Sequence, residues 1–135
     1  MCLKSKHITL VVYVLFLLSG STMPSYPAHV GSAEEGMRIF RQCIACHHAS
    51  REDNKVGPSL KNVMHRQAGT KSGYRFSPAM IKAGENGLVW NKQTLKNYLH
   101  NPQTMVKGTR MPPVRITSEQ DIDDLIAYLE KASQE

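Results

Sequence analysis

Apolar residues follow a helical spacing near both ends of this 135-residue chain and no regular spacing in its middle. Near the C-terminus they recur at intervals of three and four residues: Ile122, Leu125, Ile126 and Leu129. This spacing places them on one face of an amphipathic helix, which Thr117 or Ser118 can cap. The chain is therefore expected to end in a helix that buries one side.

A second helix is expected to begin near Ala33. Ser32 and Glu35 have the spacing of a capping box, in which each side chain satisfies a backbone N–H of the first turn. The predicted apolar face consists of Met37, Phe40 and Ile44. This helix would lead directly into Cys43.

The middle of the chain predicts loops and short helices rather than a sheet. Residues 50–87 are rich in Gly, Pro, Ser, Asn and Lys, which indicates turns and at most one short helix. Asn91 can cap a helix through Leu95 and Leu99, which Pro102 would stop. Three helices and a long loop hold little apolar material, so the all-α fold needs something else at its centre.

The first residues have the pattern of an export signal. Lys4 and Lys6 precede an apolar run over 8–18, and small residues and prolines follow. A run of eleven residues is too short to cross a bilayer as a helix. An uncleaved anchor that extends to Met23 is the alternative interpretation.

The predicted organisation is a signal peptide with a short linker over 1–33 and one folded domain over 34–135. Cleavage could follow Ser21, Ala28 or Ala33. The expected location is the bacterial periplasm, with a membrane anchor if the signal is retained. The mature chain would then contain Cys43 and Cys46 as its only cysteines.

Cys43, Cys46 and His47 form a C-x-x-C-H run, which is typical of covalent haem attachment. Two thiols at this spacing can bond the two vinyl groups of one porphyrin while the next histidine approaches the iron. Structural zinc would need a further pair of ligands, and no cysteine follows residue 46. A disulfide is the remaining alternative in an oxidising compartment.

The chain from Gly36 to Ala132 resembles a class I c-type cytochrome. The matching pieces are G-x-x-x-F at Gly36–Phe40, C-I-A-C-H at Cys43–His47, V-G-P-S-L at Val56–Leu60, Trp90, L-x-x-Y-L-H-N-P at Leu95–Pro102, K-G-T-R-M-P at Lys107–Pro112 and D-L-I-A-Y-L at Asp124–Leu129. The resemblance implies a small cytochrome c fold in which the N- and C-terminal helices cross and loops wrap one covalent haem c.

The resemblance also implies roles for individual residues. His47 would be the proximal iron ligand, with the Pro58 carbonyl accepting its other ring N–H. Gly36 would let the first helix cross the last one closely, and Phe40, Leu125 and Tyr128 would pack around the crossing.

Three residues are implied as partners of the haem propionates: Trp90, Arg66 and Thr109. Tyr98 would lie beside the sulfur of the distal ligand. Phe76 stands where relatives often have a tyrosine, and P-P-V-R-I-T follows Met111 where many have an aromatic residue and a glycine. The exposed haem edge is therefore expected to be covered differently.

Several side chains compete by composition for the sixth iron position: Met64, Met80, Met105, Met111, His65 and His100. Met64 and Met80 are expected nearer the proximal side in the resembled fold. Gly108 permits a turn before Met111, and prolines after it stiffen the exit. The resemblance independently selects Met111, with Met105 as the fallback. His48 and His100 are expected to be solvated or capping residues.

Charge is unevenly distributed along the chain. Eleven Lys and Arg residues and the single acid Glu85 lie between Lys55 and Arg115, whereas six acids and only Lys131 lie between Glu119 and Glu135. In the resembled fold the basic loops surround the haem edge, which would steer it toward acidic docking sites. Export and the lack of an aromatic-basic motif argue against nucleic acid.

The predicted function is that of a soluble one-electron carrier with a His/Met-ligated haem c, and not of an enzyme. Iron with His47 and Met111 as ligands has no open position for a substrate. The expected partners are membrane or periplasmic redox enzymes, such as a cytochrome bc complex, a terminal oxidase or a dehydrogenase, and the chain is expected to be a monomer. The alternative is a dedicated cytochrome subunit or electron acceptor of one periplasmic dehydrogenase.

Overall fold

The computed structural model describes residues 30–116 and 118–134. The described part is all-α, and its five helices are α2 (Ala33–Phe40), α3 (Pro78–Glu85), α4 (Lys92–His100), α5 (Pro102–Met105) and α6 (Glu119–Ala132). Over the same residues the only strand-like pairing is the isolated bridge between Gln67 and Val89. The fold class predicted from the sequence is confirmed.

The predicted signal peptide falls almost entirely outside the described residues. Within 30–116 and 118–134, no helix is both long enough and apolar enough to cross a membrane.

The helices begin where side chains can cap them. The Ser32 hydroxyl accepts the Glu35 N–H at 3.4 Å, and the Ser118 hydroxyl accepts the Asp121 N–H at 3.4 Å. At α4 both halves of a capping box are present between Asn91 and Thr94. These contacts satisfy N–H groups that have no partner within a helix, so the predicted starts of three helices are confirmed.

The apolar face predicted for the first helix is correct for Phe40 and wrong for Met37 and Ile44. Helix α2 ends at Phe40, and the following residues form turns. Met37 is 51% exposed and Ile44 is 49% exposed, whereas Gly36 and Phe40 are buried. Ile44 lies beyond the end of the helix, so the helical spacing that placed it beside Phe40 does not apply.

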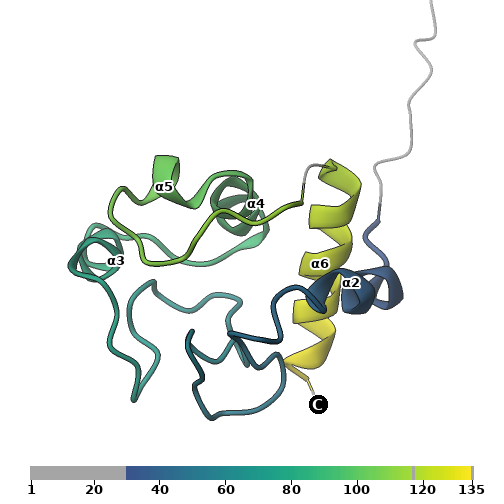
Figure 1. Cartoon of the computed structure of the whole chain (residues 1–135), viewed down its shortest axis with the longest axis horizontal. Coiled ribbons are helices and arrows are strands. Elements are labelled where there is room, and N and C mark those ends of the chain that lie inside the picture. Colours follow the sequence, from purple (N-terminus) through teal and green to yellow (C-terminus); the bar gives the residue numbers. More distant parts are fainter. Residues whose placement is uncertain (1–29, 117, 135) are drawn as a thin grey trace, which may run out of the picture.

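Helices α2 and α6 cross in close contact on one side of the molecule (Figure 1). A Cβ atom on Gly36 would lie 1.9 Å from the backbone oxygen of Asp124, so no other residue fits without moving a helix. The rings of Phe40 and Tyr128 pack beside this point with their centroids 5.3 Å apart. The crossing implied by the resemblance is therefore present.

The remaining helices extend away from the crossing. Helix α4 contacts α6, α3 and α5 lie farther from the α2–α6 pair, and long loops connect these parts (Figure 1). Ile122 and Leu125 of α6 are almost completely buried and pack with Leu95 and Leu99 of α4 in one apolar core. The helices thus form walls around the space where the functional residues gather.

We expect Gly36→Ala to lower the free energy of unfolding by about 3 kcal/mol, because its methyl group meets the α6 backbone rather than a flexible side chain. Urea denaturation of the haem-loaded protein measures the change. Met37→Ala on the exposed face of α2 is the control, with an expected loss below about 0.5 kcal/mol. Equal losses in both variants would contradict the close crossing.

Candidate functional site

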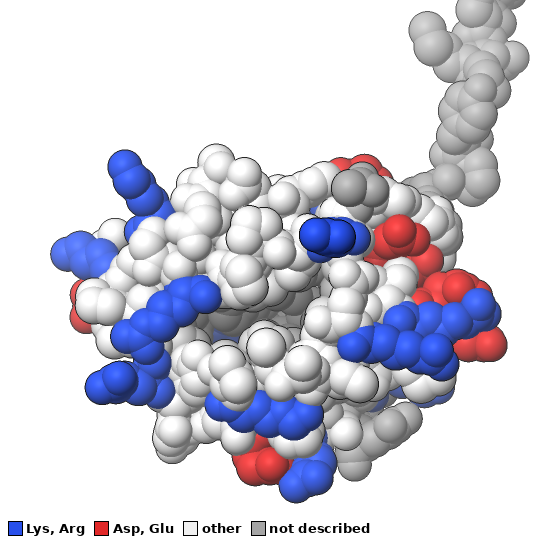
Figure 2. Space-filling model, viewed as in Figure 1, with Lys and Arg blue, Asp and Glu red and all other residues white. Residues whose placement is uncertain are grey.

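A deep cavity lies between the helices and the long loops. Its empty volume is about 960 Å³, part of which is open to solvent, and its opening forms a hollow in the surface (Figure 2). All the site residues predicted from the sequence except Cys46 line it: Cys43, His47, Pro58, Arg66, Trp90, Tyr98, Thr109 and Met111. The fold thus brings together residues from distant parts of the chain.

The two cysteines lie in a turn that continues from α2. The Cys43 N–H donates to the Phe40 carbonyl at 2.7 Å, and the His47 N–H donates to the Cys43 carbonyl at 2.9 Å. Both thiols are free and partly buried. Burial, and then the neighbouring Cys46, raise the pKa of Cys43 to about 11. Cys46 does not line the cavity, but its carbonyl accepts the Gly57 N–H at 2.8 Å.

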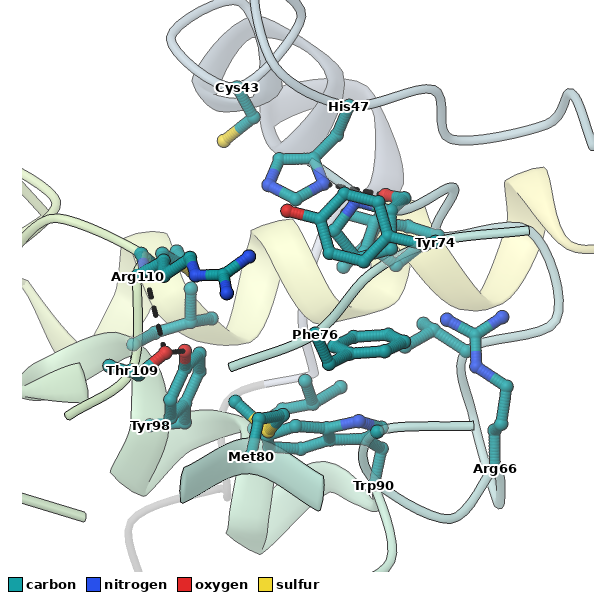
Figure 3. A pocket seen from close by; sticks show the side chains of 18 of the residues that line it. Cys43, His47, Arg66, Tyr74, Phe76, Met80, Trp90, Tyr98, Thr109 and Arg110 are labelled. Carbon is teal, nitrogen blue, oxygen red and sulfur yellow. Dashed lines mark hydrogen bonds between the residues drawn. The ribbon is translucent and has the colours of Figure 1, made fainter. Parts of the chain in front are cut away.

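The His47 ring is held in one orientation at the cavity wall (Figure 3). Its Nδ1 lies 2.7 Å from the Pro58 carbonyl oxygen, which can only accept, so Nδ1 carries the proton. Burial is the main cause that lowers the pKa of His47, and the charge of Lys55 lowers it further. The neutral ring therefore has a lone pair on Nε2 with which to bind a metal.

Gly57 makes room for that ring. A Cβ atom at this position would lie 2.4 Å from Cε1 of His47. The chain therefore passes directly beside the imidazole, and the Pro58 carbonyl follows within reach of Nδ1. These two neighbours determine which ring nitrogen is left unengaged.

Aromatic side chains form the wall away from His47 (Figure 3). Trp90 and Tyr98 are buried, with their ring centroids 5.0 Å apart. The Tyr98 hydroxyl lies 2.6 Å from the Thr109 hydroxyl, which also accepts the Met111 N–H at 3.4 Å. Burial raises the pKa of Tyr98, which keeps the phenol protonated. Tyr98 thus contacts the segment that carries Met111 through Thr109.

The structure places two methionines in the cavity wall. Met111 was expected there, but Met80 on α3 also lines the cavity and is 6% exposed. Met80 lies near Trp90 and away from His47 (Figure 3), so its expected place on the proximal side is wrong. Met64 and Met105 pack against the core and do not line the cavity. Among the methionines of the described residues, only Met80 and Met111 therefore line its interior.

Arg66 lines the cavity and reaches the loop that follows His47. Its guanidinium donates to the Lys61 and Ser59 carbonyls, at 3.0 Å each. Burial lowers the pKa of Arg66, but an arginine stays charged. Its charge lies beside the cavity, where a carboxylate of a bound group could approach it.

Phe76 lines the cavity without a hydroxyl, and Tyr74 lines it two residues earlier. Their rings meet edge to face with centroids 4.8 Å apart. The Tyr74 hydroxyl donates to the Val56 carbonyl at 2.9 Å, which connects this segment to the loop beside His47. Residues two apart in an extended segment share a side, and this spacing could have revealed Tyr74.

Three further histidines of the described residues lie outside the cavity wall: His48, His65 and His100. His48 contacts Asp53 at 3.1 Å, and His100 contacts Glu119. His65 is exposed, with a positive φ of 62°.

Sequence reasoning missed Arg110, which lines the cavity and donates to the Arg75 carbonyl at 2.9 Å. Its position in the sequence, directly before Met111, could have indicated that it belongs to the site.

The cavity residues fit a flat apolar ring with a metal at its centre and acidic groups at its edge. One thiol and one imidazole lie at one wall, the rings of Phe76 and Trp90 lie at the other, and Arg66 and Arg110 supply positive charge. A His ligand with a hydrogen-bonded Nδ1 suits haem iron. This all-α fold and its cavity fit the class of proteins that hold one haem between helices and loops.

Comparisons with known proteins agree. The family model described as Cytochrome c matches residues 33–133. Cytochrome c2 of Afifella marina is 43% identical over 95 residues, which cover 70% of this chain and 77% of that protein. Cytochrome c2 of Agrobacterium tumefaciens (strain II Chrys) is 40% identical over 100 residues, covering 73% and 90%.

A solved structure is also similar. Cytochrome cH from Methylobacterium extorquens aligns with a TM-score of 0.68 and 41% identity, covering 75% of this chain and 99% of that one. The chain belongs to the cytochrome c family. It is an electron carrier with a covalently bound haem c, whose iron takes up and releases one electron.

We expect Cys43→Ser or Cys46→Ser to lower the yield of covalently attached haem severalfold in a periplasmic expression host, because each thiol would supply one of the two bonds to the haem. Haem staining of a denaturing gel measures attachment. Cys2→Ser is the control and should leave the yield unchanged. A Cys43→Ser/Cys46→Ser double variant that still retains haem on the gel would refute attachment through this pair.

Proposed function

We propose that this chain shuttles single electrons between redox enzymes in the bacterial periplasm, with His47 and Met111 as the two iron ligands. The observation that carries the proposal is that both side chains line one cavity although they are far apart in the sequence. His47 contributes an unengaged Nε2, and Met111 contributes a soft thioether, which favours the reduced metal.

The same arrangement supports a role without catalysis. Two side-chain ligands leave no iron position for a substrate. Phe76, Met80, Trp90 and Leu95 make the cavity wall largely apolar and so limit the entry of water. The protein's contribution would be to hold the haem and present one edge of it to a partner.

Surface charge supports docking to acidic sites. Lys and Arg side chains lie on several sides of the hollow, whereas most acidic side chains visible on this face lie over α2 and α6 (Figure 2). Lys55 and Lys107 are exposed. The Lys55 ammonium donates to the carbonyl of Ile44, between the two cysteines. Complementary charge would speed encounter with a bc complex, a terminal oxidase or a dehydrogenase.

The proposal includes export through the N-terminal segment, with residues 34–135 forming the working domain. A role as electron acceptor of one dedicated dehydrogenase is the second candidate. The charge pattern fits both, because either partner would need an acidic docking site. Measured rates with purified partners from each class would separate them.

We expect Met111→Ala to lose the iron–sulfur charge-transfer band, to lower the reduction potential and to bind carbon monoxide in the reduced form. Haem should stay attached through Cys43 and Cys46. Met80→Leu is the matched variant, because Met80 is the other cavity methionine, and it should keep the band. If Met111→Ala kept the band while Met80→Leu or Met105→Ala lost it, Met111 would not be the sixth ligand, and the variant that lost the band would identify that ligand.

We expect electron transfer to an acidic partner to slow as ionic strength rises, since the Debye length is about 10 Å at 0.1 M salt. Lys55→Glu or Lys107→Glu should slow the reaction several-fold further at low salt. Stopped-flow kinetics measure the rate, and Lys131→Glu on α6 is the control. If the rate changed neither with salt nor with the two charge reversals, the basic surface would have no role in docking.

A further inference from the structure

The segment that carries Met111 follows α5, and we call residues 106–113 the strap. Three of its residues, Thr109, Arg110 and Met111, line the cavity. The strap turns at Gly108, whose φ of +95° is in the left-handed region that favours glycine. The backbone bond from the Thr109 N–H to the Val106 carbonyl, 2.9 Å long, closes this turn. Glycine can adopt many backbone conformations, so the turn alone does not fix the strap. Other contacts must hold it in place.

Gln103 supplies two such contacts from α5. Its Nε2 donates to the Thr109 carbonyl at 2.8 Å, and its Oε1 accepts the Gly108 N–H at 3.3 Å. One side-chain amide therefore binds two consecutive residues of the turn with both of its ends. Although Gln103 is an exposed residue, both ends of its amide are engaged within the protein.

Thr109 is held from the opposite direction as well. Its hydroxyl lies 2.6 Å from the hydroxyl of Tyr98, which is buried in α4. The same hydroxyl accepts the Met111 N–H at 3.4 Å. Tyr98 thus holds the side chain of Thr109 while Gln103 holds its backbone, two residues before the proposed ligand.

Helix α5, which carries Gln103, is itself held in place. Pro102 begins α5, and the Asn101 side chain caps it by accepting the Thr104 N–H at 3.1 Å. The Val106 N–H donates to the Pro102 carbonyl at 2.9 Å. Because the backbone of α5 is held by these contacts, the Gln103 side chain can keep the strap in one position.

We propose that Gln103 is a positioning residue that keeps the strap closed over the cavity and the Met111 thioether on the iron. The inference rests on the proposed assignment of Met111 as a ligand. Removal of the Gln103 amide frees the Gly108 turn without disturbing the core, because the side chain is exposed. The strap then opens more often, and an external ligand competes better for the iron.

The test compares Gln103→Met with Gln93→Met. Methionine is similar in length to glutamine and forms neither contact. Gln93 is an exposed residue of α4 whose amide donates to the side chain of Asn97 at 3.0 Å, far from the strap in sequence. The ferric, haem-loaded proteins are titrated with imidazole, and the charge-transfer band and thermal midpoint are recorded. We expect imidazole to bind Gln103→Met about fivefold more tightly than wild type, the size of one or two lost hydrogen bonds, with a weaker band and no change in Gln93→Met.

Gln103→Glu adds a pH profile that a merely structural role would not produce. A neutral carboxylic acid can donate to the Thr109 carbonyl, whereas a carboxylate cannot and is repelled by it. The band of this variant should be close to wild type near pH 4 and should weaken as pH rises past the ordinary glutamate pKa of about 4.3. Wild type and Gln103→Met should show no such step.

The outcomes separate this inference from the ligand assignment. An unchanged band and imidazole affinity in Gln103→Met, with the band lost in Met111→Ala, would overturn the role of Gln103 and leave Met111 in place. A lower thermal midpoint alone, without a spectral change or a pH step, would also overturn it. A band that survives Met111→Ala would refute the ligand assignment itself.

Discussion

The close crossing of α2 and α6 at Gly36 is the contact on which the rest of the site depends. Helix α2 ends at Phe40, and the turn with Cys43 and His47 begins there. The position of that turn is therefore set by how α2 lies against α6. Phe40 of α2 and Leu125 of α6 also line the cavity, so the crossing forms part of its wall. A methyl group at Gly36 would displace both the wall and the turn.

The second constraint acts on the His47 ring. Burial and the charge of Lys55 lower its pKa, while the hydrogen bond to the Pro58 carbonyl raises it. The net lowering keeps the ring neutral, and the Pro58 contact places its proton on Nδ1. Gly57 permits the approach that makes this contact. The metal-binding nitrogen is thus selected by a backbone carbonyl and by the absence of a side chain.

The separation of charge follows from the same fold. Helix α6, which carries most of the late acidic residues, packs on α2 at one side of the molecule (Figure 1). The basic residues lie mainly on the segments between α2 and α6, several of which border the hollow (Figure 2). Some of this charge is internally paired: Lys96 of α4 contacts Glu119 at 2.8 Å and Asp123 at 2.9 Å. Lys55 and Lys107 are exposed, and the Lys55 ammonium donates to the Ile44 carbonyl rather than to a carboxylate.

The sequence by itself determined the elements that rest on local rules. Caps such as Asn91 and Ser118 act on the next few residues, and the spacing of Ile122 and Leu125 follows from the helix period, so α4 and α6 were predictable. The C-x-x-C-H run likewise indicates covalent haem attachment from five consecutive residues.

Contacts between distant segments were decided only by the tertiary structure. Ile44 is exposed because α2 stops before it, and Met80 reaches the cavity because α3 carries it there. Gln103 gained its contacts from a turn that only the folded strap creates. Periodicity assigns a residue to a face of its own element, but the neighbour of that face depends on how the elements pack, which no local pattern encodes.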